Sequence, residues 1–136
     1  MKFIHEKIEI GYDDLKVETK PSGRKYITPD GEAYPSITTV LGVLSADSIA
    51  AWRARVGDVE ANKISHKATT RGTAVHDLVE KYLDNEELPK VMPHVMASLA
   101  NLKPSLSRIG KIFAQEAPLY SKHLGVAGRV DCVGLY

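Results

Sequence analysis

The spacing of apolar residues changes near Gly110 from the period of a helix to that of strands, and this change constrains the fold more than any other feature. Over residues 58–83 the apolar positions recur at the spacing of one helix face. Residues 112–120 and 126–135 instead have the pattern of strands, joined by a tight connection at 123–125. The pattern predicts a long helix followed by an antiparallel β-hairpin, and therefore an α/β fold.

The segments before the long helix predict a hairpin or meander over residues 15–34, with turns at 21–23 and 29–31. Ser36 is placed to cap a short helix over 37–44, and Ser45 or Asp47 to cap the next. A further helix is expected over 93–102, ended by Pro104. We expect one domain over 1–136, made of an N-terminal hairpin region (1–35), a helical region (36–110) and a sheet hairpin (111–136).

The composition is that of an ordinary globular chain, 43% hydrophobic and 26% charged. The formal net charge is only +1, so any basic surface for nucleic acid must be local. Hydrophobic runs are too short to span a bilayer, and the N-terminus has no secretory signal. The single cysteine, Cys132, excludes an internal disulfide framework. These features predict a cytoplasmic protein without a membrane partner.

Asp131 is the one carboxylate in the final strand, where it follows Val130 and precedes Cys132 and Val133. A carboxylate buried in a strand is costly unless a cation or hydrogen bonds compensate. We therefore expect Asp131 to be buried and to have a partner, with a divalent metal as the leading candidate.

His76 lies at the edge of the apolar face of the long helix and could ligate a metal through one ring nitrogen. The alternative is a boundary histidine bonded to a backbone carbonyl. Gly72, one turn earlier, is unfavourable inside a helix. It therefore suggests close approach by another backbone or by a ligand.

Glu116 is expected to share a sheet face with Asp131. A two-residue turn at 124–125 would place Asp131 opposite Pro118 and Glu116 opposite Val133, with both carboxylates on one face. With His76 from the packed helix they would form an oxygen and nitrogen site for Mg²⁺ or Mn²⁺. The alternative for Glu116 is a rim residue paired with Lys122 or Arg129.

Basic residues follow the long helix at four-residue spacing: Lys63, Lys67 and Arg71. This basic ridge could hold phosphates by charge alone, independently of base sequence. A solvated helix face has the same pattern.

Four segments in order resemble a known family: residues 34–41, residues 51–53, residues 71–76 with Leu78, and residues 128–133. They are similar to the RecB-like exonuclease branch of the PD-(D/E)XK nuclease superfamily, of the mitochondrial genome maintenance and phage exonuclease type. The resemblance covers about residues 34–136.

The resemblance implies a restriction-endonuclease-like core. It also implies Mg²⁺- or Mn²⁺-dependent hydrolysis of DNA phosphodiesters, exonucleolytic on single-stranded or frayed ends, in DNA replication, recombination or repair. By this resemblance His76 and Asp131 are metal ligands and catalytic residues. Glu116 matches the preceding strand and shares the metal-binding and catalytic role, and Ser36 and Thr38 match the segment near the DNA strand.

One departure from the family pattern stands out, because no (Asp/Glu)-x-Lys motif follows Asp131. In this family that motif supplies a second metal-binding carboxylate and the lysine that activates water. We therefore expect an N-terminal portion of a nuclease that is inactive alone, with an unpaired strand edge through which copies could associate. The alternative is a non-catalytic DNA-binding or accessory protein that retains the front half of the fold.

Overall fold

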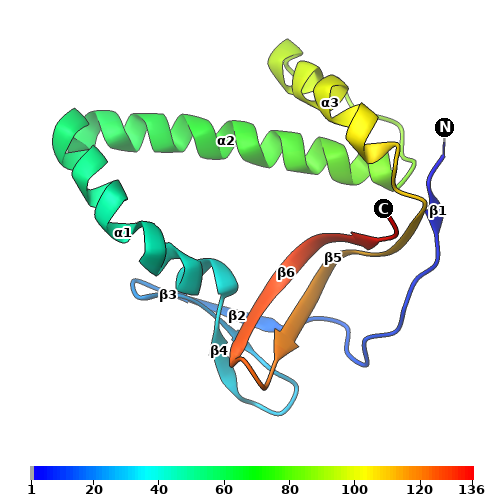
Figure 1. The fold of residues 1–136 in the computed structure, drawn as a ribbon, viewed down its shortest axis with the longest axis horizontal. Helices are drawn as coiled ribbons and strands as arrows, with labels where there is room; N and C mark the ends of the chain where they lie inside the picture. The colour runs from blue at the N-terminus through cyan, green and yellow to red at the C-terminus, as the bar shows by residue number, and fades with distance from the viewer. Residues whose placement is uncertain (1) are drawn as a thin grey trace.

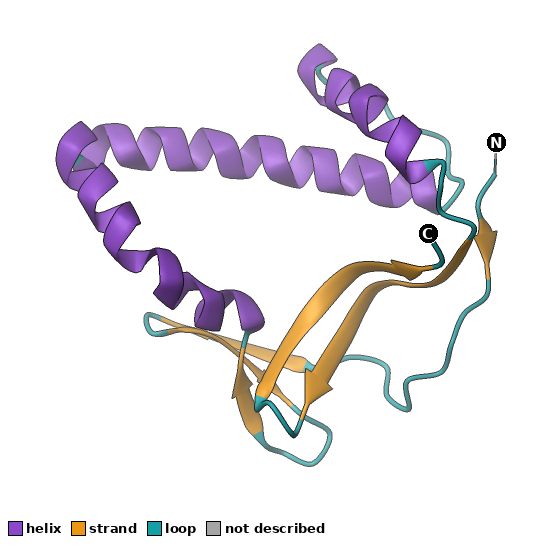
Figure 2. Ribbon diagram, in the orientation of Figure 1, coloured by secondary structure: helices purple, strands orange, loops and turns teal. Residues whose placement is uncertain are grey.

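The computed structural model describes residues 2–136. In chain order the elements are β1 (Ile4–His5), β2 (Lys16–Lys20), β3 (Gly23–Ile27), β4 (Ala33–Pro35), α1 (Ile37–Val56), α2 (Asp58–Leu83), α3 (Pro93–Leu106), β5 (Lys111–Ser121) and β6 (Val126–Gly134) (Figure 1). Three helices and two small sheets form this part of the chain (Figure 2), so the α/β class is confirmed. Over the described residues, every helix is too short or too polar to cross a bilayer.

The larger sheet has the strand order β1-β5-β6, with β1 parallel to β5 and β5 antiparallel to β6. The hairpin forms as predicted, but its register differs. Ser121 pairs with Val126, so the connection spans four residues, and Pro118 pairs with Arg129 rather than Asp131. The displacement is two residues, which keeps each side chain on its predicted face because strand side chains alternate.

The smaller sheet is a meander of β2, β3 and β4, and it packs against the β5–β6 hairpin. Lys20 pairs with Gly23 across a two-residue turn. Gly23 has a φ of 124°, which residues other than glycine rarely adopt. Leu15, Tyr26 and Ala127 form the buried contact between the two sheets.

Helix α1 is continuous over 20 residues, whereas two helices were expected. The hydroxyl of Ser45 donates to the carbonyl of Gly42 at 3.3 Å, and Ser48 donates to Ser45 at 2.9 Å. Each serine thus bonds back within the helix instead of capping a new one. Helix α3 likewise continues through Pro104, which lies in its last turn.

The predicted apolar face of α2 is confirmed as core. Leu78 packs with Val95 and Leu99 of α3, and Leu83 packs with Phe3 and Ile112. In contrast, α1 buries none of its residues, and the first half of α2 buries only Ala61. Figure 1 shows this part as an arm that leads away from the β5–β6 hairpin and returns along α2. The second half of α2 is therefore the part that is fixed against the sheet.

Candidate functional site

Three predicted site residues from three different elements line one cavity of about 230 Å³. His76 comes from α2, Glu116 from β5 and Asp131 from β6. The remaining lining residues are Val75, Val79, Glu80, Leu83, Leu102, Leu106, Ile109 and Cys132. The lining of the cavity thus combines apolar side chains with one imidazole and three carboxylates.

The imidazole of His76 faces the carboxylate of Asp131, with 3.5 Å between Nδ1 and Oδ2. The two side chains are 65% and 67% exposed. The expectation of a buried Asp131 is therefore wrong, and the cost of desolvation is no argument for a metal here. The physical reason is that apolar neighbours along a strand do not bury a side chain, because its burial depends on what packs over its face of the sheet.

Glu116 is half-buried and has a φ of 47°, in the left-handed region that residues other than glycine rarely adopt. Partial burial raises the pKa of the Glu116 carboxyl, and the carboxylates of Glu80 and Asp131 raise it further. Arg129 and His76 lower this pKa by smaller amounts. The surroundings of Glu116 thus favour its neutral, protonated form more than water does.

The alternative prediction, an ion pair of Glu116 with Lys122 or Arg129, is wrong because both cations pair with other residues. Arg129 forms its ion pair with Asp14 at 2.9 Å, and Lys122 forms one with Asp30. Arg129 does contact Glu116, but through the backbone carbonyl, to which Nη1 donates at 2.9 Å. Glu116 thus lines the cavity without an ion pair to either of these two residues.

Glu80 was not predicted as a site residue, yet it lines the same cavity, and its carboxylate raises the pKa of Glu116 more than that of Asp131 does. It follows His76 by four residues, which places the two side chains on one face of α2. That spacing is visible in the sequence and could have identified it.

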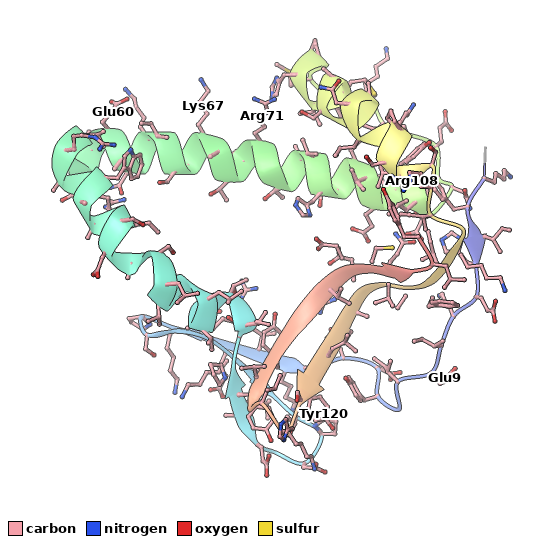
Figure 3. The ribbon with its side chains drawn as sticks, in the orientation of Figure 1. Glu9, Glu60, Lys67, Arg71, Arg108 and Tyr120 are labelled. Carbon is pink, nitrogen blue, oxygen red and sulfur yellow. The ribbon has the colours of Figure 1, made fainter. Side chains whose placement is uncertain are left out.

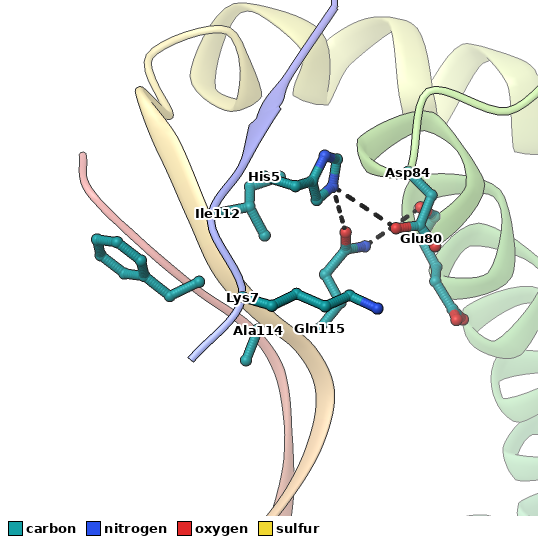
Figure 4. A pocket seen from close by; sticks show the side chains of 8 residues that line it. His5, Lys7, Glu80, Asp84, Ile112, Ala114 and Gln115 are labelled. Atoms are coloured by element: carbon teal, nitrogen blue, oxygen red, sulfur yellow. Dashed lines mark hydrogen bonds and ion pairs between the residues drawn. The ribbon is translucent and has the colours of Figure 1, made fainter. Parts of the chain in front are cut away.

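Glu80 also lines a second cavity, of about 150 Å³ (Figure 4). There the Nε2 atom of His5 lies 3.1 Å from Oε1 of Gln115 and 3.6 Å from Oδ1 of Asp84. The amide of Gln115 also donates to the backbone carbonyl of Glu80 at 3.3 Å. These contacts tie β1 and β5 to the end of α2, and so they fix the position of Glu80.

The donor set of the first cavity suits a hard divalent cation, because it offers carboxylate oxygens and one imidazole. Among residues 2–136, however, no three histidine, cysteine or acidic side chains converge closely enough to hold a metal as they stand. His76 and Asp131 are within 3.5 Å of each other. Such an open arrangement suits Mg²⁺ better than structural Zn²⁺. Mg²⁺ keeps several waters and takes one or two protein carboxylates, whereas structural Zn²⁺ is enclosed by four protein ligands.

Ser36 and Thr38, expected near a DNA strand, differ in their surroundings. Ser36 is buried, and its Oγ accepts a hydrogen bond from the amide of Thr39 at 3.1 Å as the N-cap of α1. This oxygen is therefore engaged inside the protein, while Thr38 is exposed.

The basic ridge of Lys63, Lys67 and Arg71 lies on the other side of α2 from the cavity. On a helix Arg71 and His76 are about 140° apart, and Arg71 donates to Ser98 of α3 at 3.3 Å. Figure 3 shows Lys67 and Arg71 pointing away from β5 and β6. Among the described residues, a Cβ at Gly72 would meet no atom within 4 Å, so the expected close approach by another backbone is wrong, while approach by a ligand stays a prediction.

Comparison of the chain with protein-family models, with curated proteins and with solved structures found no match.

Proposed function

We propose that the cavity between α2, β5 and β6 serves metal-dependent hydrolysis of DNA phosphodiesters, as in a RecB-like exonuclease of the PD-(D/E)XK superfamily with a restriction-endonuclease-like core. The observation that carries the proposal is that His76, Glu116 and Asp131, from three different elements, line the same cavity. Residues 71–76 and 128–133, which carry the family resemblance, supply two of these three side chains.

His76 and Asp131 would hold Mg²⁺ or Mn²⁺ directly, and Glu116 and Glu80 would contact it through water. A bound cation would supply Lewis-acid polarisation of the phosphoryl oxygen and a more acidic water. Without a cation, the three carboxylates of the cavity repel a phosphodiester. DNA binding at this site should therefore depend on the cation.

The lining residues include neither lysine nor arginine among the described residues. No permanently cationic side chain there can stabilise charge on the attacking or leaving oxygen. We expect residues 1–136 to bind the cation weakly and to hydrolyse DNA slowly or not at all, so binding is the better first measurement.

The experiment is a calorimetric titration with Mn²⁺ of the wild-type chain and of Asp131→Asn and His76→Gln. The proposal predicts one weak site in the wild type and at least ten-fold weaker binding in both variants. Lys122→Gln is a matched control, since Lys122 pairs with Asp30 away from the cavity. Equal affinity in all four proteins, or no binding, would refute the metal site.

A second candidate function is non-catalytic DNA binding, and the placement of the basic ridge favours it. Lys63, Lys67 and Arg71 are exposed, and Figure 3 shows Lys67 and Arg71 on the side of α2 that is turned away from β5 and β6. Anisotropy of a labelled single-stranded oligonucleotide, with and without Mg²⁺, separates the two functions. Binding that ignores Mg²⁺ but weakens with salt supports the ridge as the binding surface.

A further inference from the structure

Glu116 has a left-handed backbone, and its carbonyl is hydrogen-bonded by Arg129 of the neighbouring strand. Glu116 lies between Gln115 and Ala117, whose partners on β6 are Cys132 and Val130. Its positive φ turns the backbone out of the regular ladder, and its carbonyl accepts a hydrogen bond from Nη1 of Arg129 at 2.9 Å. The guanidinium of Arg129 thus satisfies the backbone carbonyl of the left-handed Glu116.

The guanidinium of Arg129 is itself fixed by the segment before β2. Its Nη2 atom donates to both carboxylate oxygens of Asp14, at 2.9 and 3.2 Å. Asp14 Oδ1 also accepts from the amide of Leu15 at 2.7 Å, and Leu15 is buried. Two residues earlier, Tyr12 Oη donates to the carbonyl of Pro118 at 2.8 Å, which ties this segment to β5.

This arrangement needs the shape of arginine. The guanidinium presents donors in a planar fork, so it can bond to the Glu116 carbonyl and the Asp14 carboxylate at the same time. A lysine at this position would keep the positive charge but would offer one flexible point instead of two fixed donors.

We infer that Arg129, held by Asp14, is a positioning residue that keeps the Glu116 backbone left-handed and thereby directs the Glu116 carboxylate into the cavity shared with His76 and Asp131. The purpose of that carboxylate rests on the proposed function, whereas the contact with Arg129 rests on the geometry alone. The two parts can therefore fail separately.

The test compares wild type with Arg129→Gln, Arg129→Lys and Asp14→Asn. One readout is the three-bond HN–Hα coupling and Cα shift of Glu116 in labelled protein, and the other is the Mn²⁺ dissociation constant. Arg53→Gln is the matched control, because Arg53 pairs with Asp58 at 3.1 Å far from the cavity.

The inference predicts that Arg129→Gln and Arg129→Lys move the Glu116 signals toward extended values and weaken Mn²⁺ binding about ten-fold. Asp14→Asn should act in the same direction but less. In a Glu116→Gln background, Arg129→Gln should weaken Mn²⁺ binding no further, since its effect passes through Glu116.

Unchanged Glu116 signals in Arg129→Gln and in Asp14→Asn would overturn the inference, as would a wild-type result for Arg129→Lys. If Arg129→Gln does not fold, Asp14→Asn carries the same test. If the wild type binds no Mn²⁺, the proposed function fails, while the Glu116 signals still decide the role of Arg129.

Discussion

Replacing Glu116 by glycine should stabilise the protein, although glycine in a strand normally destabilises it. A non-glycine residue in the left-handed region costs about 1–2 kcal/mol, and the φ of 47° at Glu116 incurs this cost. Glycine avoids it but loses about 0.5–1 kcal/mol of backbone entropy. The difference favours glycine by between about 0 and about 1.5 kcal/mol, with a midpoint of roughly 0.75 kcal/mol.

Removal of the carboxylate also changes the charge of the cavity, so Glu116→Gln is the reference for Glu116→Gly. Leu119→Gln and Leu119→Gly, in the same strand but without a positive φ, form the matched pair. Urea unfolding should show glycine more stable than glutamine at 116 and less stable at 119. The same sign at both positions would refute the reasoning from strain.

Three further predictions concern the core, the pH dependence and the basic ridge. Leu78→Ala should lower the free energy of unfolding by about 2–5 kcal/mol, because Leu78 is fully buried. Leu44→Ala, at an exposed position, should change it by no more than about 0.5 kcal/mol in urea unfolding. Equal losses of stability in the two variants would contradict the packing. Because the Glu116 pKa is raised, the folded state binds its proton more tightly than the unfolded chain, so wild-type stability should fall as pH rises from the ordinary carboxyl pKa through the raised one. Urea unfolding of Glu116→Gln should lack this fall, and parallel pH profiles would contradict the raised pKa. Lys67→Ala with Arg71→Ala should leave Mn²⁺ affinity unchanged, since the ridge faces away from the cavity, and a ten-fold loss in calorimetry would contradict that placement.

The sequence pattern predicted what depends on local periodicity. The apolar face of α2 and the placement of Glu116 and Asp131 on one sheet face both follow from residue spacing, and both hold in the structure. The predicted sheet face of Glu116 and Asp131 is right although the predicted turn length is wrong. The register differs by two residues, and an even displacement does not exchange the two sides of a strand.

What the sequence could not predict depends on contacts distant along the chain. Asp131 has valine-rich neighbours, but its exposure is set by what covers the edge strand β6. The two-residue strand β1 exists only because β5 offers it a partner. The left-handed Glu116 likewise carries no local glycine or asparagine signal, and its carbonyl is held by Arg129, 13 residues away.

The central claim is that His76, Glu116 and Asp131 share one divalent cation. Its most direct test is the paramagnetic broadening of amide signals by substoichiometric Mn²⁺ in wild type and in Asp131→Asn. We predict selective broadening around residues 76, 116 and 131 in the wild type and its loss in the variant. Broadening centred instead on the acidic end of α2 near Asp84 and Glu86, or equal broadening in both proteins, would contradict the claim.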